Sequence, residues 1–250
     1  MCQIDHGLRP AARHGARIIG TVFAGVKTNN ALFYRHFACR FALPRHLEYT
    51  LPSTSTNTGS RLVLASTSKY RRALLERLQL PFTVNGSLVD ESHADDEDPT
   101  ALVHRLSKAK AEAVSSRYPD GVVIGSDQVA VRGRILLGKP LTPDRCFEQL
   151  RDASGQRVTF YTGVHVIDLR GRRYEAHVDT TTVSFRTLSD AEIRNYIAKD
   201  QPFDCAGGFK VESLGISLFE RIDSQDPTAL MGLPLIWLSG ALRRSGFELP

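Results

Sequence analysis

The sequence lacks any long apolar run. Its nearest approach, residues 18–26, is interrupted by Gly and Thr, and a membrane-spanning helix requires roughly 18 to 20 apolar residues. A transmembrane helix is therefore excluded. The chain has 250 residues, 42% of them apolar, which is enough to bury a sizeable core in one domain or two.

Cysteine is also scarce. The four cysteines, at positions 2, 39, 146 and 205, form neither a C-x-x-C pair nor the short spacings of a zinc site. The sequence therefore favours a reduced, cytoplasmic protein without a disulfide framework. Cys146 and Cys205 are interpreted as small packing residues.

Excess charge is missing from most of the chain. The net charge of +5 arises within residues 1–60, which hold seven Lys or Arg residues against Asp5 and Glu48, whereas residues 61–250 carry 25 charges of each sign. A nucleic-acid-binding domain concentrates its cations on the folded surface. The charge distribution therefore argues against nucleic acid as a partner.

A domain boundary is predicted near residue 60. Residues 1–60 show no sustained periodicity and end in a polar, turn-forming run at 52–60. We interpret them as a basic N-terminal extension, disordered or mis-started; a targeting segment is the alternative, although the apolar run is short and no cleavage site follows. Residues 61–250 are predicted to form one domain.

Strand and helix patterns alternate from Arg61 onward. Apolar runs or period-two alternation predict strands, and 3.6-residue periodicity predicts helices. Ser189 and Glu192 form a capping box. The fold class is therefore α/β, with a mixed sheet flanked by helices. Strands are expected at 62–65, 121–125, 135–137, 157–161, 164–169 and 174–185, and helices at 71–80, 99–114, 143–152, 189–198 and 234–242.

A basic cluster lies where the first strand ends and the first helix begins. Ser66 is followed by Lys69, Arg71 and Arg72, at a position where free backbone N–H groups and the helix dipole favour anions. Cations oppose the dipole at this end. The pattern predicts a bound phosphate chain, and the alternative is a set of exposed basic residues that tolerate a small screened cost.

Asp127 lies just beyond the apolar run 122–124, within the segment Gly125–Gln128. Ligands of open α/β sheets collect outside the carboxyl ends of the strands. If the first two buried strands are parallel, Asp127 and Ser66 face one cleft. A simple turn residue is the alternative for Asp127.

Carboxylates are the candidate metal ligands. Glu91 opens an acidic stretch and is expected to join Asp127 around Mg²⁺ or Mn²⁺, because hard cations prefer oxygen ligands that they share with substrate phosphates. Asp90 is the second choice. Residues 93–98 are expected to form a solvated loop.

Several lysines could complete a phosphate site. Lys110 lies at the edge of a helical apolar stripe and Lys139 follows a short strand; each either binds phosphate or snorkels to solvent. Extended geometry across 206–212 would place Lys210 and Glu212 on one side. The double glycine at 207–208 would let the backbone approach a ligand.

Two other motifs suggest different functions, but neither motif is complete. The segment Gly133–Pro140 nearly matches a P-loop, but Pro140 replaces the hydroxyl that binds Mg²⁺. Residues 66–69 match the S-x-x-K of serine acyl hydrolases, yet neither S-D-N nor K-T-G occurs. Both functions are set aside.

The ordered set of motifs resembles the Maf family, with its closest likeness to the YceF-type branch, which acts on 7-methyl-GTP. The resemblance spans nearly all of residues 61–250. It implies a Maf-like mixed sheet flanked by helices, a central nucleotide-binding cleft, divalent-metal-dependent pyrophosphatase activity and a cytoplasmic location. The motifs are L-A-S-T-S-x-x-R-R (64–72), V-D-E (89–91), G-S-D-Q (125–128), G-K-P (138–140), F-Y-T-G (160–163) and C-A-G-G-F-K-x-E (205–212).

The resemblance also implies roles for individual residues. Asp127 corresponds to the proton acceptor, and Tyr70, Gln128 and Glu212 stand where the family sets base specificity. The sequence departs from the branch at Lys69 and Tyr70, where Pro and Trp are common. Phosphate and metal binding would fall to Ser66, Arg71, Arg72, Glu91, Lys110, Lys139 and Lys210.

The hypothesis is hydrolysis of 7-methyl-GTP to 7-methyl-GMP and diphosphate, with a nucleoside triphosphate as the substrate and neither nucleic acid nor membrane involved. The charge of a 7-methylated guanine favours stacking on Tyr70 and contact with Glu212. Two alternatives remain: a dTTP and UTP pyrophosphatase of another Maf branch, and a non-catalytic nucleotide-binding regulator of cell division. A homodimer is left open.

Overall fold

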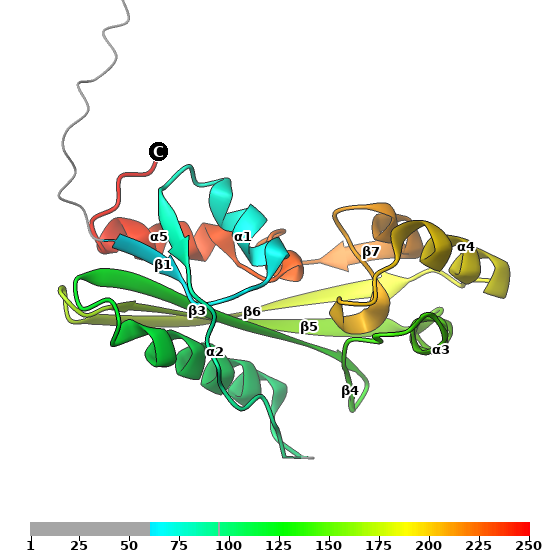
Figure 1. The fold of residues 1–250 in the computed structure, drawn as a ribbon. Coiled ribbons are helices and arrows are strands. Elements are labelled where there is room, and N and C mark those ends of the chain that lie inside the picture. The colour runs from blue at the N-terminus through cyan, green and yellow to red at the C-terminus, as the bar shows by residue number, and fades with distance from the viewer. Residues whose placement is uncertain (1–60, 95) are drawn as a thin grey trace, which may run out of the picture. The chain divides into compact units, whose positions relative to one another are not determined.

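The computed structural model describes residues 61–94 and 96–250, so the interpretation of residues 1–60 lies outside it. The described residues form one mixed sheet and five α-helices (Figure 1). The strands are β1 (Arg61–Leu64), β2 (Phe82–Val84), β3 (Gly121–Arg132), β4 (Ile135–Leu137), β5 (Arg157–Asp168), β6 (Arg173–Phe185) and β7 (Phe219–Asp223). The helices are α1 (Lys69–Glu76), α2 (Pro99–Ser115), α3 (Pro143–Ala153), α4 (Asp190–Asp200) and α5 (Leu235–Arg244).

The sheet has the order β2-β1-β3-β5-β6-β7, and β4 pairs with the end of β3. β1 is parallel to both β2 and β3, and the remaining pairs are antiparallel. β1 ends at Leu64, opposite Ile124, whereas β3 continues to Arg132. The chain therefore leaves the sheet at Ser66 while β3 runs on past it, which opens a space beside Asp127.

Alternating side chains of β1 serve the two faces of the sheet. Leu62 and Leu64 pack in a core with residues of α1 and α5, and Val63 and Ala65 pack against residues of α2 on the opposite face. Figure 1 shows α2 on one face and α1 with α5 on the other. A further core cluster around Phe160 joins the far part of the sheet to α3 and α4.

Two glycines bring α2 against the sheet. A Cβ atom on Gly125 would lie 2.2 Å from the carbonyl oxygen of Ser107, and one on Gly163 would lie 2.4 Å from that of Val103. These separations are far below van der Waals contact, so only glycine permits the observed approach. The consequence is that Lys110, on the same helix, reaches Asp127 on β3.

Most predicted elements are confirmed within a few residues. The capping box at Ser189 is present, with both reciprocal hydrogen bonds. α1 begins two residues earlier than predicted because Ser68 is its N-cap, with the hydroxyl accepting from the Arg71 N–H. The parallel pairing of β1 with β3, on which the common cleft depended, is confirmed. No helix in the described part of the chain is long and apolar enough to cross a membrane.

Other predictions were wrong or incomplete. Residues 157–161 and 164–169 form the single strand β5, since Gly163 is accommodated within the ladder. The segment 125–128 lies inside β3 rather than in a loop. Residues 206–212 are not extended, because they begin with the 3₁₀ turn η1 (Ala206–Gly208). Strands β2 and β7 and the 3₁₀ turns η2 (Leu214–Leu218) and η3 (Ala229–Met231) were not predicted.

Candidate active site

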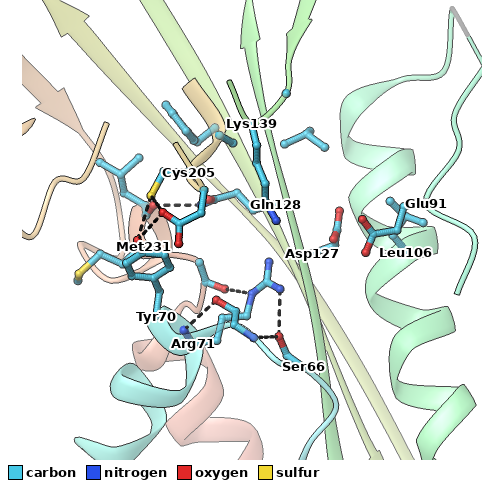
Figure 2. Close-up of a pocket in the computed structure, with 18 of the residues that line it drawn as sticks. Ser66, Tyr70, Arg71, Glu91, Leu106, Asp127, Gln128, Lys139, Cys205 and Met231 are labelled. Carbon is cyan, nitrogen blue, oxygen red and sulfur yellow. Dashed lines mark hydrogen bonds between the residues drawn. The ribbon is translucent and has the colours of Figure 1, made fainter. Parts of the chain in front are cut away.

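A cavity of about 780 Å³ lies between the N-terminus of α1, the middle of β3 and helix α2. Segments from the second half of the chain, around 204–212 and 230–232, close its remaining side. Figure 2 shows Asp127 and Glu91 on one side of this space and Tyr70 and Cys205 on the other. The cavity brings together nine of the predicted site residues: Ser66, Tyr70, Arg71, Glu91, Lys110, Asp127, Gln128, Lys139 and Glu212.

Lys110 joins two carboxylates at one end of the cavity. Its Nζ lies 2.6 Å from Asp127 Oδ1 and 2.6 Å from Glu91 Oε1. Lys110 and Asp127 are buried, whereas Glu91 is exposed. The hydrogen bond from Lys110 holds the pKa of Glu91 below its ordinary value against the effect of partial burial, and Lys139 and Arg71 lower it further. Glu91 is thus kept ionised, and it shares the Lys110 cation with Asp127.

The N-terminus of α1 faces the same space. The backbone N–H groups of Lys69 and Tyr70 have no hydrogen-bond partner among the described residues. Arg71 Nη1 donates to Ser66 Oγ at 3.4 Å and Nε donates to the Gly232 carbonyl at 3.0 Å. Burial lowers the pKa of Arg71, and the charges of Asp127 and Glu91 oppose that shift.

Arg71 forms no ion pair within the described residues, so its guanidinium retains donors for an anion. A helix N-terminus with a neighbouring arginine is a suitable phosphate site. Lys139 lines the opposite wall, is exposed and also has no ion-pair partner in the described ranges. This end of the cavity is therefore built to receive negative charge.

Gln128 ties β3 to the turn η3. Its Nε2 lies 2.9 Å from both the Thr162 hydroxyl and the Ala229 carbonyl, and 3.1 Å from the Leu230 carbonyl. These acceptors occupy the amide nitrogen, so Oε1 is the atom left to meet a ligand. Ser126 adds a second link by donating to the Gly232 carbonyl at 2.9 Å.

The other end of the cavity is organised around an aromatic ring. The Tyr70 hydroxyl donates to Asp204 Oδ1 at 3.0 Å and accepts from the Cys205 thiol at 3.3 Å. Burial raises the pKa of Cys205 to about 11, so the thiol is the form present at neutral pH. Glu212 is exposed and lines the same end. A carboxylate and a fixed ring therefore face the space where a base would stack.

The structure leaves two predicted phosphate ligands outside the cavity. Arg72 is exposed and pairs with Glu76 one turn along α1, Nε to Oε1 at 3.0 Å. Lys210 donates its Nζ to the carbonyls of Asp200 and Gln201 and so caps the C-terminus of α4. The expectation that Lys210 and Glu212 share one side is wrong, because the chain turns between Lys210 and Ser213, where the Ser213 N–H donates to the Lys210 carbonyl.

Asp204 is the cavity residue that sequence reasoning missed. Its Oδ2 pairs with Lys69 Nζ at 2.9 Å. Partial burial alone would raise the pKa of Asp204, but the hydrogen bonds from Lys69 and Tyr70 hold that pKa below its ordinary value. Lys69 was itself a signal, because a lysine in the first turn of a helix opposes the helix dipole and is stabilised by a nearby negative charge. Local sequence pattern could not identify Asp204 as that charge, since it lies 135 residues further along the chain.

The double glycine at 207–208 has a structural explanation. Both residues have positive φ, 76° and 73°, which disfavours side chains. A Cβ on Gly207 would meet Phe160, and one on Gly208 would meet Cys146. Neither glycine lines the cavity. The expectation that they approach a ligand is therefore wrong. Glycine is required here by the backbone conformation and by tight packing in the core.

The carboxylate end was tested as a site for a hard cation. Among residues 61–94 and 96–250 no group of three or more His, Cys, Asp or Glu side chains is arranged to hold a metal. Mg²⁺ usually takes one or two carboxylates together with substrate phosphates and waters. Glu91 and Asp127, which contact the same Nζ atom, supply such a pair. The donor set fits a metal that arrives with a phosphate ligand.

Comparison with known proteins agrees with this geometry. The family model described as Maf-like protein matches residues 61–245. A protein of Pseudomonas aeruginosa named 7-methyl-GTP pyrophosphatase is 51% identical over 189 residues, which cover 76% of this chain and 98% of that relative. The family match includes every element that lines the cavity. The chain therefore belongs to the Maf-like protein family.

Proposed function

We propose that this protein hydrolyses 7-methyl-GTP to 7-methyl-GMP and diphosphate and so removes a modified nucleotide from the pool. The single observation that carries the proposal is a cavity with free cations and a buried aspartate at one end, and a ring beside a carboxylate at the other. The 51% identity to a 7-methyl-GTP pyrophosphatase supports the choice of substrate.

The phosphates bind at the end formed by α1 and α2. Arg71 and the free N–H groups at the start of α1 hold phosphate oxygens, and Lys139 approaches them from the opposite wall. Ser66 orients the Arg71 guanidinium through its hydrogen bond. A divalent cation, Mg²⁺ or Mn²⁺, would be held by Glu91 and Asp127 and would neutralise phosphate charge.

Asp127 acts on the attacking water. Lys110 occupies Oδ1, so Oδ2 is available to accept a proton. The water oxygen forms a bond to the α-phosphorus as the bond from that phosphorus to the bridging oxygen breaks, and diphosphate leaves with the bonding electrons. The proton passes to Asp127 Oδ2. Positioning and electrostatics dominate such transfers, and both are supplied by groups already fixed in place.

The base lies at the end formed by Tyr70 and Glu212. Methylation at N7 makes guanine cationic, which strengthens stacking on an aromatic face and attraction to a carboxylate. Glu212 can also accept hydrogen bonds from the guanine N1–H and N2–H₂ groups. Unmodified GTP is therefore a weaker substrate in this proposal. The Gln128 carbonyl oxygen is a further contact for the nucleoside.

The test is diphosphate release from a panel of nucleotides with Mg²⁺ or Mn²⁺. The highest kcat/KM is expected for 7-methyl-GTP, a lower value for GTP, and the lowest for dTTP and UTP. Preference for dTTP or UTP would instead assign the chain to the other activity considered above. Nucleotide binding without diphosphate release under any metal condition would mark a non-catalytic regulator.

We further propose that residues 61–250 form the catalytic domain and act in the cytoplasm, where free nucleotides are found. The family match starts at residue 61, and the cavity is lined by residues of that range. Deletion of residues 1–60 should leave kcat/KM within about threefold of the full chain. Loss of folding in the deleted protein would move the domain boundary toward the N-terminus.

A further inference from the structure

An ion pair accompanies the aromatic ring at the base end of the cavity. Lys69 Nζ lies 2.9 Å from Asp204 Oδ2 and 4.9 Å from the centre of the Tyr70 ring. The other oxygen of Asp204 accepts from the Tyr70 hydroxyl at 3.0 Å. One carboxylate therefore fixes the ring and compensates the cation beside it. All three residues line the cavity.

The charges at this end determine which base it favours. The described lining holds Lys69, Asp204 and Glu212 at this end, whereas Arg71, the residue after Tyr70, directs its guanidinium to Ser66 and Gly232. Lys69 and Asp204 cancel each other at contact distance, which leaves Glu212 as the unbalanced charge. The hydrogen bond to Asp204, together with the charges of Asp204 and Glu212, raises the pKa of Lys69 and keeps it protonated.

A cation beside an aromatic ring weakens the attraction of that ring for a second cation. An uncompensated Lys69 would therefore repel a positively charged base that stacks on Tyr70, and would act far less on a neutral one. At separations of a few ångströms near a protein surface, unit charges still interact by about 1 kcal/mol or more. This is enough to alter the choice between two bases of nearly the same shape.

We propose that Asp204 is a specificity-determining residue, which neutralises Lys69 beside Tyr70 and so keeps the base end selective for a cationic purine over a neutral one. This inference rests on the proposed function, because it explains how that site distinguishes 7-methyl-GTP from GTP. In this proposal Lys69 disfavours binding of a cationic base, and Asp204 offsets that effect. The pair occupies positions 69 and 204, which are brought together only by the fold.

The experiment removes charge without changing shape. Asp204→Asn keeps an acceptor oxygen for the Tyr70 hydroxyl and loses the negative charge. The ratio of kcat/KM for 7-methyl-GTP to that for GTP should fall three- to tenfold, mainly through KM for 7-methyl-GTP, at a mildly acidic pH where the methylated base remains cationic. Lys69→Gln in the Asp204→Asn background should restore the ratio to within twofold of wild type.

Glu76→Gln provides the matched control. It breaks the Arg72–Glu76 pair on the same helix, whose partners are exposed to a similar degree but lie outside the cavity. The substrate ratio should not change in this variant. The Asp204→Asn effect should also shrink at high salt, because screening weakens charge but not shape.

An unchanged ratio in Asp204→Asn, with both substrates losing activity equally, would overturn the inference and leave Asp204 as a support for Tyr70. If the wild-type protein does not hydrolyse 7-methyl-GTP, the proposed function fails. The charge inference is then tested by the dissociation constants of 7-methyl-GMP and GMP. A fall in their ratio in Asp204→Asn supports it, and an unchanged ratio refutes it.

Discussion

Replacement of Asp127 by Asn tests the catalytic assignment most directly. The residue is 8% exposed and its Oδ1 contacts Lys110 Nζ at 2.6 Å. Asn retains an acceptor oxygen at that position, and Lys110 retains its contact with Glu91 at 2.6 Å. The variant therefore loses a charge and a proton acceptor, while no cavity is created in the core.

The cost to stability follows from those contacts. The hydrogen bond from Lys110 loses the charge of its acceptor while the donor stays charged, a difference of about 1 kcal/mol. For a domain of this size the melting temperature should fall by roughly 2 to 4 °C. Removal of a general base costs ~10²- to 10⁴-fold in rate, so kcat should fall at least 10²-fold. Nucleotide affinity should change much less, because Arg71 and Lys139 remain.

The assay combines kcat from diphosphate release, melting by circular dichroism and nucleotide affinity by calorimetry. Glu91→Gln is the matched comparison, since Glu91 touches the same Nζ atom at the same distance but is exposed. Its loss of activity should be partly rescued by high Mg²⁺ concentration, whereas that of Asp127→Asn should not. A folded Asp127→Asn protein with more than about a tenth of wild-type kcat would refute the assignment and direct attention to Glu91.

Three further predictions concern metal, packing and pH. Chelation by EDTA should abolish diphosphate release and Mg²⁺ or Mn²⁺ should restore it; full activity in chelator would contradict the metal assignment. Gly125→Ala places a Cβ 2.2 Å from the Ser107 carbonyl and should destabilise the fold by about 1 to 3 kcal/mol and lower kcat by moving α2, measured by urea unfolding and turnover. Burial lowers the pKa of His165 from its ordinary 6.5 to about 4, so the unfolded chain binds that proton in preference to the folded one in this window, and the contribution of His165 to the free energy of unfolding should fall by about 3 kcal/mol between pH 6.5 and 4. His165→Gln should flatten that pH dependence, and an unchanged slope would refute the attribution.

The fold was predictable where local pattern decides it. Periodicity alone identifies the helix from 99 to 114, and the capping residues at 189 and 192 locate the start of another. The segment 125–128 was misplaced because its Gly, Ser and Asp are typical of turns. In the structure, the ladder with β5 and the close approach of α2 hold these residues in a strand, and neither contact is visible in a local window.

The candidate site was also predictable only where local pattern decides the position of a residue. Ser66 and Arg71 were identified because they lie where a strand is followed by a helix N-terminus, a place that favours anions. Asp127 was identified because a strand was predicted to end just before it, where ligands gather in α/β sheets, although β3 in fact continues past it. Arg72 and Lys210 were assigned by adjacency to motifs, and side-chain direction sends both elsewhere, to Glu76 and to the end of α4. Asp204 was missed because its role exists only through contacts with residues far earlier in the chain.

The two ends of the cavity depend to different degrees on the later part of the chain. The phosphate end is formed mainly by β1, α1, α2 and β3, together with Lys139 after β4 and the Gly232 carbonyl that holds Arg71, and its central contacts join Lys110 to residues 91 and 127. The base end closes only when residues 204–212 dock on α1, 134 residues away from Tyr70 in the case of Asp204. Substitutions in the later segment can therefore change which base is accepted while the groups that hold phosphate stay in place. Selectivity and hydrolysis are separable at Asp204 and Glu212, since their segment carries none of the residues proposed to bind phosphate or metal, whereas Tyr70 and Gln128 adjoin Arg71 and Asp127 in the chain.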